Sequence, residues 1–171
     1  KEEFRKCPID LHRVLAEVGE LFQVSAGSGV RLSLELEAPN HWVMANAIQL
    51  NQVFINLLIN GQDAMPDGGR LTIATRQVLS RQSPDGEGTG RIQRLVQIDV
   101  IDAGCGMDEE IQRRVFEPFF TTKETGKGTG LGMALVYSTV ASHGGSIRLD
   151  SAPGRGTTVS VTLPSIDPVA R

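Results

Sequence analysis

The sequence predicts a two-layer α/β sandwich, in which a mixed sheet of about five strands carries three main helices on one face. Several segments alternate apolar and polar side chains with the two-residue period of a half-buried strand. Three other segments, residues 9–24, 47–64 and 131–143, carry apolar side chains at helical spacing. The chain has 171 residues, 40% of them hydrophobic, which is enough for one compact domain with its own core.

The elements follow one another along the chain with recognisable boundaries. Asp10 is placed to cap the first helix, and the apolar residues 42–44 form a short piece able to pair at a sheet edge. Asp108 is placed to cap a short helix over residues 109–115. Residues 80–90, rich in glycine and polar side chains, are interpreted as a long mobile hairpin loop. The strands are expected at residues 30–37, 70–78, 92–101, 146–151 and 156–163.

Composition excludes several classes of protein. The formal net charge is -3, so the chain as a whole lacks the excess of positive charge that attracts nucleic acid, and we do not expect a nucleic-acid-binding groove. Cys7 and Cys105 form no CxxC pair and no His/Cys cluster, which argues against a structural zinc and fits a reducing compartment. No stretch has the length of a membrane span and no signal-peptide pattern opens the chain. We therefore expect a cytoplasmic domain. Because the sequence begins at Lys1 and not at a methionine, we also expect it to be an excerpt from a longer protein, which is either free or anchored to a membrane.

The helix over residues 47–64 is apolar almost all round, which predicts that it is buried. One polar stripe interrupts this pattern. Such a stripe is either a wall that faces a ligand or a solvent-facing side of a core helix, and spacing alone leaves both open. The stripe consists of Gln49, Gln52, Asn56, Asn60 and Asp63.

A glycine-rich run, residues 126–132, precedes the helix over residues 131–143. Its four glycines can bring bare backbone N–H groups against an anion, and the helix adds its positive N-terminal end. We interpret the run as a phosphate cradle; the alternative is a flexible linker. It matches neither the P-loop pattern nor the dinucleotide-binding fingerprint.

Asp102 follows a buried strand and precedes two glycines, Gly104 and Gly106. A carboxylate held there can accept a hydrogen bond from the amino group of a flat ligand, although an aspartate that starts an ordinary turn is the alternative. Thr157 has the parity of the apolar residues in the last strand, so its hydroxyl should point inward.

The aromatic segment 116–123 has neither helical nor strand period, and its rings either anchor a loop to the core or form a docking patch. Together with the glycine run it forms one long segment, residues 107–130, that borders the cradle. His12, His41 and His143 have no visible carboxylate or cysteine partner at ligand spacing, and we assign all three to structure.

Four of these motifs, in this order, resemble the signatures of the catalytic and ATP-binding domain of sensor histidine kinases. This family lies within the GHKL group, which also holds gyrase, mismatch-repair and heat-shock chaperone ATPases. Four motifs in order over residues 45–163 argue against chance, and the phenylalanine box favours histidine kinases over the other branches. The asparagine box is matched by residues 56–64, the first glycine box by residues 102–106, the phenylalanine box by residues 116–120 and the second glycine box by residues 126–132.

The resemblance implies a Bergerat ATP-binding fold that uses ATP and Mg2+. Asn60 would be the catalytic metal ligand, holding Mg2+ through its amide oxygen, and Asn56 would support the phosphates. Asp102 would accept the adenine amino group, and Thr157 would complete the adenine pocket. The further nucleotide contacts that we carry over are Asp63, Gly104, Gly106, Lys123, Lys127, Gly128, Thr129, Gly130, Leu131 and Gly132.

Two features depart from the family. Gly61 stands where the family usually has alanine, which weakens a helix interior by about 1 kcal/mol. Asp63 and Ala64 stand where close relatives often have a basic and an aromatic residue, so extra phosphate and base contacts are expected to be missing.

The function that the resemblance implies is transfer of the ATP γ-phosphate to a histidine on a separate dimerisation unit of a two-component sensor kinase. The chain itself has no His-Glu pair. We expect residues 1–24 to be a linker and first helix that follow that unit, residues 25–165 the catalytic domain, and residues 166–171 a tail. The expected partners are the dimerisation and phosphoacceptor helices of a homodimeric parent and the receiver domain of a response regulator.

Two alternatives remain. A GHKL ATPase would hydrolyse ATP with a water-activating glutamate early in the asparagine helix, where this chain has Gln49, Gln52 and Asn56. A nucleotide-sensing module would bind ATP and dock a partner without transferring phosphate.

Overall fold

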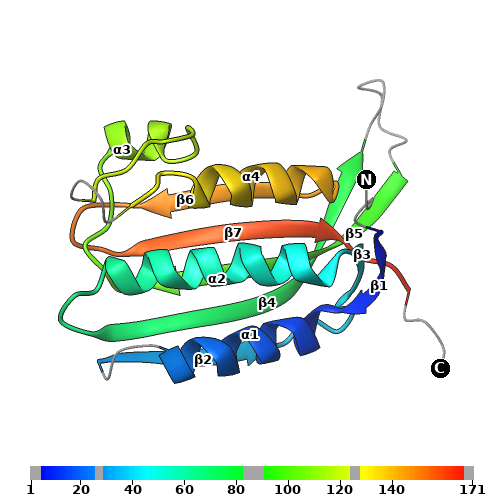
Figure 1. Ribbon diagram of the computed structural model, residues 1–171. Helices are drawn as coiled ribbons and strands as arrows, with labels where there is room; N and C mark the ends of the chain where they lie inside the picture. The colour runs from blue at the N-terminus through cyan, green and yellow to red at the C-terminus, as the bar shows by residue number, and fades with distance from the viewer. Residues whose placement is uncertain (1–4, 26–28, 83–90, 124–127, 168–171) are drawn as a thin grey trace.

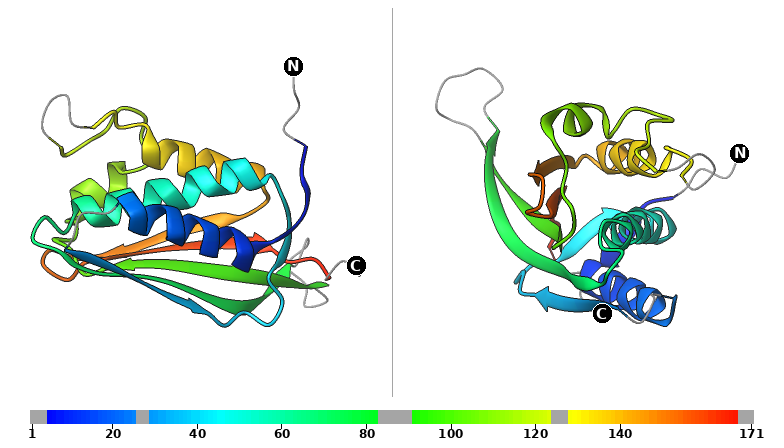
Figure 2. Two further views of the ribbon diagram at one scale, coloured as in Figure 1. Left: turned by 60° about the horizontal axis from the view of Figure 1, so that its bottom comes forward. Right: turned by 90° about the vertical axis from the view of Figure 1, so that its left-hand side faces the viewer.

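The computed structural model describes residues 5–25, 29–82, 91–123 and 128–167, and it has two layers (Figure 1). A five-stranded sheet with the order β2-β4-β5-β7-β6 forms one layer. Helices α1 (Leu11–Ser25), α2 (Ala47–Asp63) and α4 (Gly132–Ser142) cover one face of it (Figure 2). This arrangement confirms the predicted α/β sandwich. The strands are β2 (Val30–Leu36), β4 (Gly69–Gln82), β5 (Arg91–Asp102), β6 (Ser146–Ser151) and β7 (Thr157–Pro164).

The sheet is mixed, as predicted, because β2 runs parallel to β4 while the other neighbours are antiparallel. Its register decides which polar side chains meet. Asp102, the last residue of β5, lies opposite Leu71 of β4 on one side and opposite Thr157 of β7 on the other. The predicted loop over residues 80–90 belongs to β4 up to Gln82, and residues 83–90 lie outside the described part of the chain.

The start of the chain differs from the prediction. Ile9 and Asp10 end a strand, β1 (Cys7–Asp10), and the first helix begins only at Leu11. β1 pairs antiparallel with β3 (Trp42–Ala45), so the apolar piece at residues 42–44 does pair at a sheet edge, in a separate two-stranded sheet. Ile9 belongs to a strand and not to the helix, because it pairs with Val43 across this small sheet. Asp10 does cap α1, since its Oδ1 accepts the Arg13 N–H at 3.2 Å.

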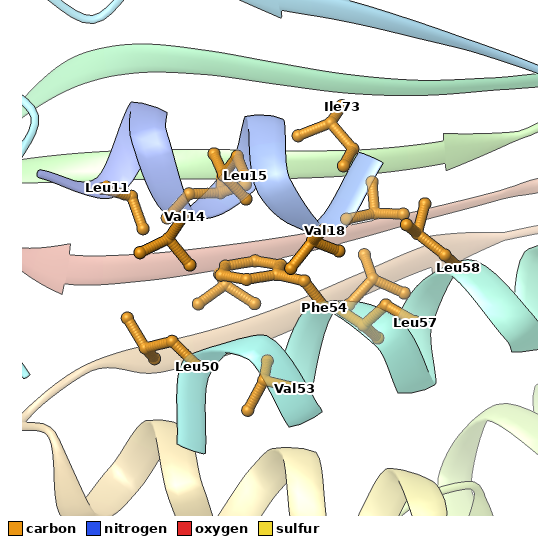
Figure 3. Close-up of a cluster of buried hydrophobic side chains, with 14 of the residues drawn as sticks. Leu11, Val14, Leu15, Val18, Leu50, Val53, Phe54, Leu57, Leu58 and Ile73 are labelled. Atoms are coloured by element: carbon orange, nitrogen blue, oxygen red, sulfur yellow. The ribbon is translucent and has the colours of Figure 1, made fainter. Parts of the chain in front are cut away.

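The core lies between the helices and the sheet (Figure 3). Phe54 of α2 is fully buried there against Leu15 and Val18 of α1. α2 is the middle helix of its layer, flanked by α1 and α4 (Figure 1). α2 is buried on the side that faces the sheet, as predicted, but two of its apolar residues are not: Ile48 is 72% exposed and Ile59 is 44% exposed.

The remaining described helix is short. α3 (Glu109–Arg114) begins at Asp108, whose Oδ1 accepts the Ile111 N–H at 2.9 Å, so the predicted cap is present. Within the described ranges, no helix combines the length and the apolar character needed to cross a bilayer.

Candidate functional site

Asp102 is the best-defined polar group of the site. Its Oδ1 accepts two backbone N–H groups, from Gly104 at 2.8 Å and from Thr157 at 3.2 Å. Burial raises the pKa of this carboxyl, and the two amide hydrogen bonds partly oppose that rise. Among the described residues, none donates a hydrogen bond to Oδ2. Asp102 is thus held rigidly through one oxygen and has the other available for a donor on a ligand.

Two glycines let the backbone close around this carboxylate. A Cβ on Gly61 would lie 3.3 Å from the Asp102 Cβ and 2.6 Å from a methyl group of Leu71. A Cβ on Gly104 would lie 2.6 Å from the Ala64 Cβ and 2.8 Å from the Asp102 Oδ1. Gly61, which weakens α2 as a helix former, is therefore a point at which α2 approaches the end of β5 too closely for a side chain. This contact brings Asn60, its neighbour in α2, to the same end of the fold as Asp102.

Thr157 points inward, as its parity predicts, and is 8% exposed. Its Oγ1 lies 2.9 Å from the Ser151 Oγ. The Ser151 hydroxyl donates to the Gly156 carbonyl at 3.0 Å, so the Thr157 hydroxyl is the donor between the two side chains. Ser151 also accepts the Met107 N–H at 2.8 Å, which ties the loop after Asp102 to β6. Sequence reasoning missed Ser151, because a serine at a strand end carries no motif.

The loop after Asp102 is fastened at both ends. Cys105 N–H donates to the Ala64 carbonyl at 3.0 Å, which joins it to the end of α2. Gly106 has a φ of 68°, and a Cβ there would collide with the Ala152 carbonyl. The first glycine motif therefore forms a rigid connection from β5 to both neighbouring elements.

The polar stripe of α2 faces α4 and the segment before it. Gln52 Nε2 donates to Asn56 Oδ1 at 3.2 Å, and a Cβ on Gly132 of α4 would lie 3.8 Å from the Asn56 Cγ. One turn further on, the Lys123 Nζ lies 3.5 Å from Asn60 Oδ1 and 2.5 Å from Asp63 Oδ2. These contacts favour the interpretation as a wall for Asn56, Asn60 and Asp63, whereas Gln52 faces solvent.

The donors at this wall suit a hard divalent cation. Asn60 and Asp63 offer two oxygens, and an ammonium group already contacts both of them. In the described part of the chain, no three His, Cys, Asp or Glu side chains gather as metal ligands. A cation here would therefore take most of its oxygens from water and from a bound phosphate, which is the coordination that Mg2+ prefers.

The glycine run is described from Gly128 onward, whereas Gly126 and Lys127 lie outside the described residues. Gly130 has a φ of 66°, and its carbonyl accepts the Phe119 N–H at 2.9 Å. The Leu131 N–H donates to Thr129 Oγ1 at 3.4 Å. α4 starts at Gly132 after Leu131, which provides no side-chain cap. The first N–H groups of α4 are thus left without a capping side chain, as an anion site at a helix N-terminus requires.

The three phenylalanines of the aromatic segment, residues 116–123, differ in how they pack. Phe116 packs against Tyr137 of α4 with ring centroids 5.6 Å apart, and the Arg114 guanidinium lies 4.4 Å from the centre of the Phe120 ring. Phe116 thus packs the segment against α4, whereas Phe120 contacts Arg114 of α3, six residues before it. Phe119 is 75% exposed and has a φ of 68°, which is rare for a residue with a side chain.

The three histidines lie away from this site. His12 and His41 stack with ring centroids 3.8 Å apart, and His12 Nε2 contacts Thr75 Oγ1 at 2.9 Å. Burial, followed by the neighbouring His41, lowers the pKa of His12. His41 Nε2 lies 3.4 Å from Asp10 Oδ1, a carboxylate contact that spacing in the sequence did not predict. The chain folds back between these residues, and spacing in the sequence does not reveal the contact.

Comparison with known proteins identifies many relatives. The family model described as histidine kinase-, DNA gyrase B- and HSP90-like ATPase matches residues 45–167. Sensor kinase CckA of Brucella abortus is 36% identical over 174 residues, which cover 97% of this chain and 18% of that protein. The sensory histidine kinase/phosphatase NtrB of Rhodobacter capsulatus is 36% identical over 160 residues, covering 92% of this chain and 43% of that protein. The chain thus spans less than half the length of these curated relatives.

Solved structures agree with the sequence relatives. The mycobacterial sensor histidine kinase MprB superposes with a TM-score of 0.72 at 26% identity, covering 94% of this chain and 97% of that one. The nucleotide-free catalytic domain of histidine kinase ThkA superposes with a TM-score of 0.74 at 25% identity, covering 94% and 95% of the two chains.

Proposed function

Because this chain belongs to the histidine kinase-, DNA gyrase B- and HSP90-like ATPase family, we propose that it binds ATP with Mg2+ and transfers the γ-phosphate to a histidine on a separate dimerisation unit. Its relatives CckA and NtrB are named as sensor kinases, which supports the kinase branch of the family. The single observation that carries the proposal is the Asp102 carboxylate, fixed through Oδ1 by two backbone amides and left with Oδ2 for a ligand.

This geometry supports the proposal that the site binds adenine. The exocyclic amino group of adenine is a donor, and a carboxylate is an acceptor only, so Asp102 Oδ2 and this amino group are complementary. Gly104 and Gly106 keep the backbone beside the base free of side chains. Thr157 donates its hydroxyl to Ser151 and retains lone pairs, so it can accept a hydrogen bond from the base or from a bridging water.

The phosphates would lie between the polar stripe of α2 and the start of α4. Asn60 would hold the Mg2+ ion with Asp63 beside it, and Asn56 would support the phosphate chain. When bound, Mg2+ neutralises charge on the phosphate oxygens during transfer. Lys123 and Lys127 would add positive charge. The backbone N–H groups that would contact phosphate oxygens belong to Gly128, Thr129, Gly130, Leu131 and Gly132.

The phosphate acceptor would come from outside this chain, which has no His-Glu pair. We propose that the segment before α1 connects the domain to dimerisation and phosphoacceptor helices, with residues 166–171 as a tail. α1 itself belongs to the domain, because Leu11, Leu15 and Val18 are buried in its core. A receiver domain of a response regulator would then take the phosphate from the histidine. Phosphoryl transfer needs little covalent chemistry from the enzyme, so positioning by Asp102 and Asn60 would carry most of the catalysis.

Labelled ATP tests this proposal. The chain is incubated with [γ-32P]ATP, Mg2+ and a separately purified pair of phosphoacceptor helices from a relative such as CckA, and acid-labile phosphate on the helices is counted. We expect label on the helices that disappears in an Asn60→Ala variant. Release of inorganic phosphate without labelled helices would favour the ATPase alternative. Binding without either product would favour a nucleotide-sensing module.

A further inference from the structure

Lys123 occupies an unusual position between the two halves of the site. Its ammonium contacts Asn60 Oδ1 and Asp63 Oδ2, which belong to one face of α2. Its stem passes beside the glycine run, because a Cβ on Gly128 would lie 3.1 Å from the Lys123 Cδ. The backbone N–H of Lys123 is fixed by Thr121 Oγ1 at 3.2 Å. One side chain therefore spans from the phosphate cradle to the oxygens assigned to the metal.

We infer that the Lys123 ammonium holds the cation position of the nucleotide-free protein, so that Mg2+ must displace it from Asn60 and Asp63 when metal-bound nucleotide enters. This inference rests on the proposed function. Two oxygen acceptors that face one centre attract whichever cation is present, and a carboxylate such as Asp63 is more stable with a counter-charge beside it. Mg2+ and the ammonium cannot share that centre, because both are cations that require the same oxygens.

The exchange gives Asp63 a role that spacing alone does not indicate. The positive charge beside Asp63 comes from Lys123, 60 residues along the chain. Displacement releases that ammonium beside Gly128, where the phosphates are expected. The same side chain thus protects the metal site before binding and is released toward the phosphates after it.

The solvent exposure of Lys123 and Asp63 determines how strongly the Lys123 ammonium competes with Mg2+. The side chain of Lys123 is 34% exposed and that of Asp63 is 46% exposed, so their pairing resembles an ion pair near the surface. Such pairs are typically worth less than tenfold in an equilibrium constant. Removal of Lys123 should therefore lower the Mg2+ concentration for half-maximal nucleotide binding by about two- to fivefold.

The midpoint, which is the Mg2+ concentration for half-maximal nucleotide binding, can be measured from the fluorescence anisotropy of an ADP analogue at increasing Mg2+. The analogue has no γ-phosphate, so the measurement does not depend on catalysis. Lys123→Met should lower the midpoint, and Lys123→Arg, which keeps the charge, should leave it near that of the unmodified chain. Asp63→Asn should raise the midpoint. In the Asp63→Asn background, Lys123→Met should have less than half of its original effect, because the two residues act on one equilibrium.

Arg13→Met is the matched control, since it removes one positive charge from an exposed pair with Glu17 on α1 and should not move the midpoint. An unchanged or higher midpoint in Lys123→Met, with weaker binding at every Mg2+ concentration, would show that Lys123 is only a phosphate contact and would overturn the inference. An unmodified chain that binds no ADP analogue at any Mg2+ concentration would instead overturn the proposed function, and the inference with it.

Discussion

Replacement of Asp102 by asparagine separates nucleotide recognition from folding. The amide oxygen of the substituted side chain can still accept the Gly104 and Thr157 N–H groups, at present distances of 2.8 and 3.2 Å. Its NH2 group would then face the adenine amino group, donor against donor. Loss of a hydrogen bond to a charged acceptor is worth about 1.5–3 kcal/mol, so ATP affinity should fall by at least about tenfold.

The same substitution should not reduce stability. Because burial raises the pKa of Asp102 above its ordinary value of 3.8, the folded protein retains this proton to higher pH than the unfolded chain does. The free energy of unfolding therefore falls as the pH rises from the pKa of Asp102 in the unfolded chain to its pKa in the folded protein. Above the folded pKa, the charged carboxylate keeps the protein less stable by this full amount. Asp102→Asn removes the cost, so its stability relative to the unmodified chain should be greater at pH 7 than at pH 3.5.

Two measurements check this reasoning. Urea unfolding at both pH values reports the free energy of unfolding, and anisotropy of a fluorescent ATP analogue reports affinity. Asp99→Asn is a suitable control, because it neutralises another carboxylate of β5 that pairs with Arg76 and Gln97 away from the site. ATP affinity that is unchanged in Asp102→Asn, or lowered equally in Asp99→Asn, would refute the assignment of the adenine contact.

Three further substitutions test the cradle, the core and the start of α2. Gly130→Ala should weaken ATP binding by about five- to thirtyfold while circular dichroism stays unchanged, because alanine at positive φ costs about 1–2 kcal/mol and its Cβ would collide with the Phe119 backbone. Phe54→Ala should lower the free energy of unfolding by about 3–5 kcal/mol, whereas the exposed Ile48→Ala should change it by less than about 0.5 kcal/mol in the same urea titrations. Asn46→Ala should cost about 1 kcal/mol, because Asn46 Oδ1 caps α2 by accepting the Gln49 N–H at 3.1 Å, and an unchanged urea midpoint would contradict that role.

Local patterns determined most of the architecture of this protein. The two-residue and helical periods are set by which side chains must be buried, so they revealed the five strands of the main sheet and the three helices on its face. The same periods placed Asn56, Asn60 and Asp63 on one side of α2 and turned Thr157 inward. Four motifs in their order were sufficient to indicate the family.

Tertiary structure decided what depends on the path of the chain between distant segments. β1 was missed because four residues pair only with a strand that follows much later, at Trp42–Ala45. Gly61 looked like a defect of α2 until the approach of Asp102 and Leu71 explained the missing side chain. The contact of Lys123 with Asp63 has no periodic signal at all. Periodicity reports only whether a side chain faces apolar or polar surroundings, and which polar groups meet is set by strand register and helix packing once the core has formed.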